Sequence, residues 1–493
     1  MIVETLLRRR EQLLPSRARS FIPLSFVVPP GAESLRLRFS FAPAEVDRIR
    51  NLLTLSLFDP RGFRGAGHRH APQQEIVIAR HEATPGFLPG DLEAGEWLVE
   101  IDCHCVLPSE RGGLEYALQV ACTRRGATAG WDVEPPAPAT AVPATFAPSP
   151  AGPPRWLKGE LHMHSDHSDG RLPLLSLVHY AREHRLDFLA LTDHNTTSPT
   201  PELARAVRAA GLDIVLIPGM ELTTFHGHAN ALGVTAWIDW RVAGPQPGPV
   251  PARAGAGNDA GPATQPAAPG NPFAPHPGRT MEQAAAEVRR LGGTFVINHP
   301  RSMGYPQCTG CRWEFDDRSA TYADAIEVWN GIWGPRRQNV DALELWTQWL
   351  NAGHRVPAVA GTDTHTAPRR PDLLPFTYVW AAPDPAAILA AVREGSTYLS
   401  IGPALVWRTP QPRQSYSPGD PLVMAVNGLH TPAELHLVHN GKTEAAWPVN
   451  GERTVSVTPP ASAGGWYRGE LYRRGSAELL AMTNPVFATS PPA

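Results

Sequence analysis

The chain has 493 residues, which is enough for two or three domains, and its hydrophobic content of 42% is enough to form packed cores. A formal net charge of -3 argues against a nucleic-acid-binding protein with a broad basic face. The first residues lack the apolar run and the cleavage site of a signal peptide, and no segment has the apolar length of a membrane span. We therefore expect a cytoplasmic protein with no membrane partner.

The N-terminal part is predicted to form a β-sandwich domain over residues 1–132. Its first segment, MIVETLLRRREQLL, has charged side chains scattered among leucines, which favours a short amphipathic helix. Residues 20–125 then alternate apolar and polar positions over short runs such as SLRLRFSF and LLTLSLF, with turn residues between them. Many short strands at regular spacing are typical of an antiparallel sandwich. The Pro/Ala-rich residues 133–155 are predicted to form an extended linker.

Strand and helix patterns alternate over residues 156–403. LDFLALTDH is a buried strand pattern, LPLLSLVHYAREH is a helix pattern, and TMEQAAAEVRRLGG begins with a capping box from Thr280 to Gln283. Such alternation indicates a parallel sheet and favours an α/β barrel. Residues 241–278 interrupt this domain with a Pro/Gly/Ala-rich insertion that cannot bury a core.

The remaining residues, 404–493, show strand patterns again and are predicted to form a small C-terminal β-domain. Asn440 and Gly441 stand between two of these patterns, ELHLVHNGK and the run that follows. The pair Asn-Gly suits a two-residue turn that needs positive φ angles. We therefore expect a β-hairpin at this point.

Candidate metal ligands follow the predicted strands of the middle domain. They are His162, His164, Asp169, His194, Glu221, His228, His299, Asp363 and His365. Imidazoles and carboxylates are the ligands that zinc and manganese take in proteins. Each motif by itself has an ordinary explanation, since a lone HxH arises by chance and a lone histidine is often a packed core residue. Their order at successive strand ends, where α/β barrels place their chemistry, predicts a metal centre.

The order of these motifs resembles the PHP (polymerase and histidinol phosphatase) superfamily. The phrases GMELTTFHGHANALG, INHP, AIEVWNGIW and VPAVAGTDTH are similar to the CehA/McbA-type metallohydrolases, which include carbaryl hydrolase. The resemblance covers residues 156–403 and implies a distorted (β/α)7 barrel that holds two or three divalent ions, with zinc first and manganese or iron as alternatives. An N-terminal β-rich domain fits the same branch.

The resemblance also implies how the ligands divide among the metal ions. His162, His164, Glu221 and Asp363 would hold a first metal, and Glu221 would bridge to a second metal held by His228 and His299. Asp169, His194 and His365 would hold a third, although other members carry a histidine where this chain has Asp169. With two metals only, His194, His365 and Asp169 would instead act as catalytic residues that transfer protons.

Substrate contacts are predicted beside this centre. Arg301 follows His299 closely and would meet an anion, while Trp329 and Asn330 at the next strand end would contact an apolar or aromatic leaving group. The resemblance to carbaryl hydrolase favours cleavage of an ester, carbamate or amide bond of a small molecule, and phosphoester cleavage is the alternative hydrolytic function. A binding protein with an inactive barrel is the alternative outside enzymes. We expect a small-molecule substrate rather than a nucleic acid, and a homodimer stays open.

Overall fold

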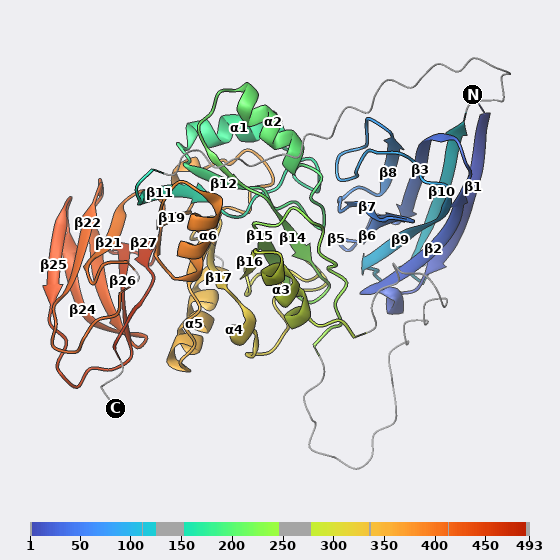
Figure 1. The fold of residues 1–493 in the computed structure, drawn as a ribbon. Coiled ribbons are helices and arrows are strands. Elements are labelled where there is room, and N and C mark those ends of the chain that lie inside the picture. The colour runs from blue at the N-terminus through green and yellow to red at the C-terminus, as the bar shows by residue number, and fades with distance from the viewer. Residues whose placement is uncertain are drawn as a thin grey trace, which may run out of the picture.

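The computed structural model describes residues 2–110, 112–124, 152–245, 278–334, 337–412 and 414–489. Most of the predicted linker at 133–155 and most of the insertion at 241–278 lie outside the described residues. The N-terminal strands lie at one end of the molecule and the C-terminal strands at the other, and helices α1–α6 all belong to the part between them (Figure 1). Among the described residues, every helix is too short or too polar to cross a membrane.

The N-terminal part consists of two four-stranded antiparallel sheets. One sheet has the order β1 (Ile2–Leu13), β10 (Leu114–Arg124), β3 (Ala32–Ala42) and β8 (Gln73–Ala79). The other has the order β2 (Ser20–Val28), β9 (Gly95–Cys105), β6 (Leu52–Asp59) and β7 (Gly62–Gly67). Apolar side chains from both sheets share one core, among them Leu37, Leu55, Val99 and Val120. We call this part the sandwich; a short pair, β4 (Glu45–Val46) and β5 (Ile49–Arg50), and a 3-10 turn (Pro15–Arg17) complete it.

The amphipathic helix predicted for the first fourteen residues is wrong, because this segment forms strand β1. It pairs with β10 in antiparallel register from Ile2 opposite Arg124 to Leu13 opposite Leu114. A helix of this length is marginally stable by itself in water. The free edge of β10 provides backbone partners along the whole segment, so tertiary pairing overrides the local pattern.

The middle part is a mixed α/β structure built on two sheets. One sheet contains β13 (Val215–Ile217), β12 (Phe188–Ala190), β11 (Arg155–Glu160), β19 (Phe376–Ala381) and β20 (Thr397–Ser400). The other contains β14 (Gly219–Thr223), β15 (His228–Leu232), β16 (Thr294–Ile297), β17 (Ala325–Asn330) and β18 (Ala358–Gly361). The helices around them are α1 (Leu174–Glu183), α2 (Thr200–Ala209), α3 (Met281–Arg290), α4 (Ser319–Tyr322), α5 (Gln338–Asn351) and α6 (Pro385–Arg393), with a 3-10 turn at Pro371–Leu373. The capping box predicted at α3 is confirmed in both directions, from Thr280 to Gln283 and back.

The strict strand–helix alternation expected of a barrel is broken in the second sheet. Strands β14 and β15 pair in antiparallel fashion, because residues 224–227 between them leave no room for a helix. The triplets β13-β12-β11 and β16-β17-β18 are parallel. The two sheets meet through isolated bridges at Met163–Thr364 and His194–Glu221 rather than through continuous pairing. The described strands therefore form an α/β fold whose sheets adjoin at the predicted ligand positions.

The C-terminal strands continue the first sheet of the middle part. Strand β20 pairs with β27 (Leu479–Thr483), and β26 (Trp466–Arg473), β23 (Ala433–His439) and β24 (Lys442–Val449) follow, with β28 (Val486–Phe487) on β26. A second sheet contains β21 (Ala404–Thr409), β22 (Leu422–Asn427) and β25 (Arg453–Val457). The predicted hairpin is confirmed: Asn440 and Gly441 join β23 to β24 with φ angles of 48° and 87°.

Candidate metal centre

The nine predicted ligands lie together where the two sheets of the middle part adjoin. His162 and His164 follow β11, His194 follows β12, and His299 follows β16, while Glu221 and His228 belong to β14 and β15. Asp363 and His365 follow β18, and Asp169 lies in the loop after His164. Backbone hydrogen bonds join these strand ends, such as the one from the Asp363 N–H to the His162 carbonyl at 2.8 Å. Segments far apart in the chain are thereby held at fixed positions around one cluster.

Glu221 occupies the centre of this cluster and is fully buried. Its Oε1 lies 3.5 Å from His162 Nε2 and 3.4 Å from both His228 Nδ1 and His299 Nε2. Its Oε2 lies 2.7 Å from His194 Nδ1. One carboxylate therefore faces imidazoles through both of its oxygens, which is the arrangement that a residue shared by two cations requires.

The remaining ligands form one group on each side of His164. Asp363 Oδ1 lies 3.1 Å from His164 Nε2 and 3.5 Å from His162 Nε2. On the other side, Asp169 Oδ1 lies 3.3 Å from His194 Nε2 and 3.1 Å from His365 Nε2. The His164 ring stacks on the rings of His194 and His365, with centroids 4.3 and 4.2 Å away.

Several buried nitrogens of this cluster lack a hydrogen-bond partner among the described residues. They are His162 Nε2, both ring nitrogens of His164, and His228 Nδ1. Buried polar atoms are nearly always paired in folded proteins, because an unpaired one loses its hydration without compensation. A divalent cation would satisfy these nitrogens, and the surrounding carboxylates would balance its charge. The donor set therefore fits a centre for divalent metal ions.

Electrostatics keep the carboxylates of this cluster and His164 in the forms that bind a cation, whereas the neighbouring carboxylates raise the pKa of four other imidazoles, those of His162, His194, His299 and His365. Burial alone would raise the pKa of Glu221, but the imidazoles of His194, His162 and His228 hold it well below its usual range. Asp363 is likewise kept as a carboxylate, chiefly by His162 and His365, which outweigh the burial that raises its pKa. Burial, together with His365 and His194, lowers the pKa of His164 to about 3, so its imidazole is neutral. Neutral imidazoles and ionised carboxylates are the forms that coordinate metals.

The comparison with protein families places a known domain on this cluster. The PHP domain family matches residues 160–265, which include six of the predicted ligands, from His162 to His228. Residues 160–265 are thus similar to a PHP domain, and we use the label PHP domain for the middle part of the chain that contains them. The segments with His299 and with Asp363 and His365 lie beyond the matched residues and complete the cluster in space.

A part of the chain is also similar to two curated proteins. Over 65 residues the chain is 45% identical to the 5'-3' exoribonuclease Rnm of Salmonella typhimurium and 43% identical to the same enzyme of Escherichia coli. The match spans 13% of this chain and 22% of each relative, so about a fifth of their length. Among solved structures, a two-domain protein from Bacteroides vulgatus containing a predicted PHP-like metal-dependent phosphoesterase is 18% identical, with a TM-score of 0.37 over 68% of this chain and 96% of that one.

Three buried polar residues that the sequence analysis did not select hold the ligands of the PHP domain. Glu327 accepts a hydrogen bond from His162 Nδ1 at 3.1 Å and from the His299 backbone N–H at 2.9 Å. Glu160 Oε1 accepts the His162 N–H at 2.9 Å, and Asn298 donates to Glu221 Oε1 at 2.8 Å. A signal for Glu327 is present in the sequence, since it follows and precedes apolar residues in the strand pattern AIEVW, where a buried charge needs a partner.

The structure places two of the predicted substrate contacts, Trp329 and Asn330, in strand β17. The prediction for Trp329 is wrong, because its side chain is fully buried in the hydrophobic core against Trp333. The reason is a bulge between Glu327 and Trp329, which adds one residue to the strand. Because of it, Glu327 and Asn330 both face the metal cluster, and Asn330 Nδ2 donates to Glu327 at 3.1 Å and to Asp363 at 3.3 Å. Arg301 is half-buried in the loop after His299, and its role stays a prediction.

The sandwich packs against the PHP domain on the side of the cluster. The rings of Phe63 and Trp237 stack with centroids 4.5 Å apart, and the Gly86 N–H donates to His167 Nδ1 at 3.3 Å. Arg19 and Glu314 form an ion pair at 2.8 Å. The sandwich residue His68 brings its ring within 4.5 Å of the His194 ring, centroid to centroid. The neighbourhood of the predicted centre thus includes a domain in which the sequence analysis placed no site residue.

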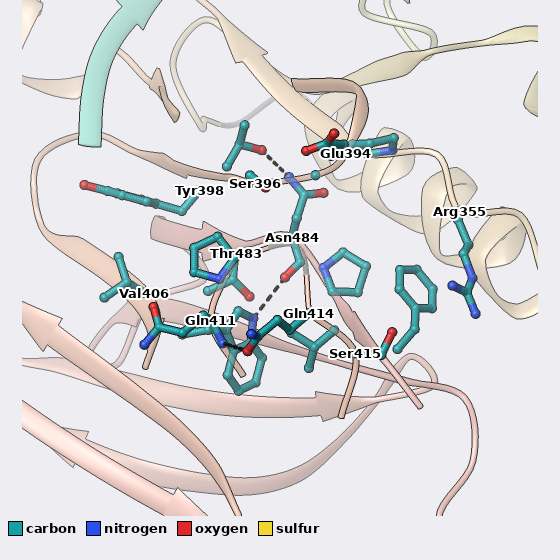
Figure 2. Close-up of a pocket in the computed structure, with 18 of the residues that line it drawn as sticks. Arg355, Glu394, Ser396, Tyr398, Val406, Gln411, Gln414, Ser415, Thr483 and Asn484 are labelled. Atoms are coloured by element: carbon teal, nitrogen blue, oxygen red, sulfur yellow. Dashed lines mark hydrogen bonds between the residues drawn. The ribbon is translucent and has the colours of Figure 1, made fainter. Parts of the chain in front are cut away.

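A separate cavity of about 290 Å³ lies between the PHP domain and the C-terminal strands. Figure 2 shows Asn484 in its wall, with Tyr398 and Arg355 among the other lining residues. Its residues Val356 and Pro357 precede strand β18, whereas Asp363 and His365 follow it. The cavity therefore lies at the opposite end of β18 from the ligand cluster and is not part of the candidate metal centre.

Proposed function

We propose that this protein is a metal-dependent hydrolase whose PHP domain cleaves phosphoester bonds. The observation that supports this most directly is the buried Glu221 carboxylate with imidazoles at both of its oxygens. His162, His164, Glu221 and Asp363 would hold a first metal ion, Glu221, His228 and His299 a second, and Asp169, His194 and His365 a third. Such ions, when bound, lower the pKa of a coordinated water towards neutrality and polarise the substrate oxygen. Zinc is proposed first, with manganese or iron as alternatives.

The chain's own residues have two tasks in this proposal. Glu327, Glu160 and Asn298 fix the orientation of ligands, as their hydrogen bonds to His162, His299 and Glu221 indicate. His365 is the more accessible member of its pair with Asp169, since a third of its side chain is exposed. In a centre with two metal ions, the His365–Asp169 pair would hold a proton at His365 Nε2 for the leaving group.

Two observations favour phosphoesters as the bond type. The two curated relatives that match 65 residues of this chain are named as exoribonucleases, enzymes that cleave phosphodiesters. The aromatic contact expected from Trp329 is also missing, because its ring lies in the core. The second candidate is hydrolysis of an ester, carbamate or amide, which the similarity of GMELTTFHGHANALG and VPAVAGTDTH to the CehA/McbA type favours. We also propose that the chain is of the CehA/McbA subtype, that its middle part is a closed (β/α)7 barrel, and that its substrate is a small molecule.

A substrate panel on zinc-loaded and manganese-loaded protein tests the bond type. It contains an aryl phosphate monoester, an aryl phosphate diester, a short RNA, an aryl acetate and an aryl methylcarbamate. We expect turnover of phosphoesters that a chelator abolishes. Turnover of the acetate or carbamate alone would contradict the phosphoester proposal and support the second candidate. Turnover of RNA alone would overturn the small-molecule expectation, and a protein with less than one metal ion per chain would support an inactive binding domain.

Glu221→Ala tests the shared position of this carboxylate. We expect the variant to lose most of its bound metal and to lose activity by more than about 100-fold, the upper range for a residue that merely supports a ligand. Elemental analysis and initial rates measure the two effects. Glu344→Ala on the exposed face of α5 is the matched control and should change neither. Full metal occupancy in Glu221→Ala would contradict the shared position.

A further inference from the structure

The sandwich presents a second HxH motif next to the PHP domain. His68 and His70 directly follow strand β7, with Arg69 between them. Arg69 donates from its guanidinium to the Pro85 carbonyl within the sandwich. The two imidazole rings lie with centroids 6.1 Å apart. One residue separates the two histidines in the sequence, as it does His162 and His164.

Both histidines face Asp169 of the PHP domain. His70 Nε2 lies 3.6 Å from Asp169 Oδ2, whereas Asp169 Oδ1 faces His194 and His365. One ligand atom from each of His68, His70 and Asp169 lies within 4.8 Å of the others. The Asp169 carboxylate thus has His70 of the sandwich at one oxygen and His194 and His365 of the PHP domain at the other, with His68 close by.

The burial of His68 points to a ligand at this place. Its side chain is 5% exposed, and its Nδ1 has no hydrogen-bond partner in the described parts of the chain. Its surroundings are other rings, those of His194 at 4.5 Å and His104 at 4.8 Å. An imidazole buried at a domain interface with an unpaired nitrogen is costly unless something binds it.

The chemistry of the three groups selects a cation over an anion. Two imidazoles alone would suit a phosphate or a carboxylate ligand, but the Asp169 carboxylate beside His70 would repel it. Two histidines and one carboxylate are a common donor set for zinc and similar metals, with a further position left for water. Asp169 faces His70 with Oδ2, and it faces His194 and His365 with Oδ1. A carboxylate in this position can provide one oxygen to each of two neighbouring metal sites.

We propose that His68, His70 and Asp169 form a divalent-cation site that joins the sandwich to the PHP domain, beside the Glu221 cluster and sharing Asp169 with it. The sandwich then contributes ligands of its own to the metal-binding region, and the PHP domain without it lacks this site. The inference extends the proposed hydrolase function but has a separate test, because none of its sandwich residues touches Glu221.

The test is the metal content of the full-length protein. Wild type, His68→Ala/His70→Ala and Glu221→Ala are stripped with a chelator, reloaded with zinc, desalted and measured by elemental analysis. We expect the double variant to hold about one zinc ion fewer per chain than wild type while the ions of the Glu221 cluster remain. The control His81→Ala/His179→Ala removes one exposed histidine from each domain and should keep the wild-type count.

Thermal unfolding provides the second measurement. Zinc should raise the melting temperature of the stripped wild type by more than that of the double variant, because a ligand that binds the folded state alone stabilises it. His70→Gln, at a side chain that is 43% exposed, repeats both measurements without disturbing the buried His68. A wild-type zinc count and a wild-type temperature shift in both variants would overturn the inference. If Glu221→Ala kept the wild-type zinc count while the double variant lost one ion, the shared position of Glu221 in the proposed function would be wrong and this site would stand.

Discussion

Glu327 shows how one buried carboxylate can orient two candidate metal ligands at once. It accepts hydrogen bonds from His162 Nδ1 and from the His299 backbone, and it is 2% exposed. The hydrogen bond from His162 Nδ1–H to Glu327 keeps a proton on Nδ1 and turns Nε2 towards Glu221. The tautomer of His162 therefore depends on Glu327. Glu327 therefore belongs to the centre although its side chain reaches no proposed metal position.

Glu327→Gln is expected to weaken metal binding by about 10- to 100-fold, the usual cost of losing such a supporting group. Gln keeps the size of the side chain but places an amide N–H where an acceptor is needed. Competition with a chromophoric chelator measures the affinity. An affinity equal to that of wild type, or of the exposed control Glu344→Gln, would show that the His162 tautomer does not depend on Glu327.

Glu100 is a buried acid at the contact between the sandwich and the PHP domain. It is fully buried, with Arg241 Nη1 at 3.4 Å from each of its oxygens. Burial raises its pKa from 4.5 to about 7, although Arg241 acts in the opposite direction. As the pH rises, the Glu100 carboxyl loses its proton near pH 4.5 in the unfolded chain but only near pH 7 in the folded protein. The free energy of unfolding therefore falls as the pH rises from about 4.5 to about 7.

Glu100→Gln removes this titration. Between pH 4.5 and pH 7.5 we expect wild type to lose stability relative to the variant by on the order of 3 kcal/mol. Urea unfolding at several pH values measures the difference, and Glu96→Gln at the exposed start of β9 is the control. Parallel stability curves for wild type and Glu100→Gln would refute the assignment.

Among the elements, helix α3 is an example of a structure that its own sequence specifies. Thr280 Oγ1 accepts the Gln283 N–H at 3.2 Å, and Gln283 accepts the Thr280 N–H at 2.9 Å. The pattern of four residues contains everything that this contact needs. That is why the capping box could be predicted without the rest of the chain.

Thr280→Ala should destabilise the protein by about 1 kcal/mol, since the first turn of α3 then loses its side-chain cap. The effect appears as a lower midpoint in urea unfolding. Glu282→Ala, in the same turn but outside the capping box, should change the midpoint less. An equal effect of both substitutions would indicate that general helix propensity, rather than the cap, stabilises this end.

Strands β1 and β17 show what element-level patterns miss. The pattern of β1 permits an amphipathic helix, and its pairing partner β10 is more than a hundred residues away in the chain. In β17, simple alternation would put Glu327 and Trp329 on one face, but the bulge between them turns Trp329 into the core and Asn330 to the cluster. Both outcomes depend on a neighbouring strand that a local window does not contain.

In the whole molecule, the predicted insertion of 241–278 has closely spaced ends. The Ala243 N–H donates to the Arg279 carbonyl at 2.7 Å, so a short turn can join them. We expect a chain in which 246–277 is replaced by Gly-Gly to keep its melting temperature within a few degrees, because long surface loops change loop-closure entropy only weakly. Differential scanning calorimetry measures this, and the substrate panel shows whether substrate range changes. A large drop in melting temperature would show that the insertion is structural.

The sequence by itself selected nine candidate metal ligands that the structure brings together, because ligand type and strand-end position are local properties. It also determined the cap of α3 and the Asn440–Gly441 hairpin. Only the tertiary structure decided that β1 is a strand, that Trp329 is buried, that Glu327 orients His162, and that His68 and His70 of the sandwich face Asp169. These features arise from contacts between segments distant in the chain, and packing free energy, rather than any local pattern, selects them.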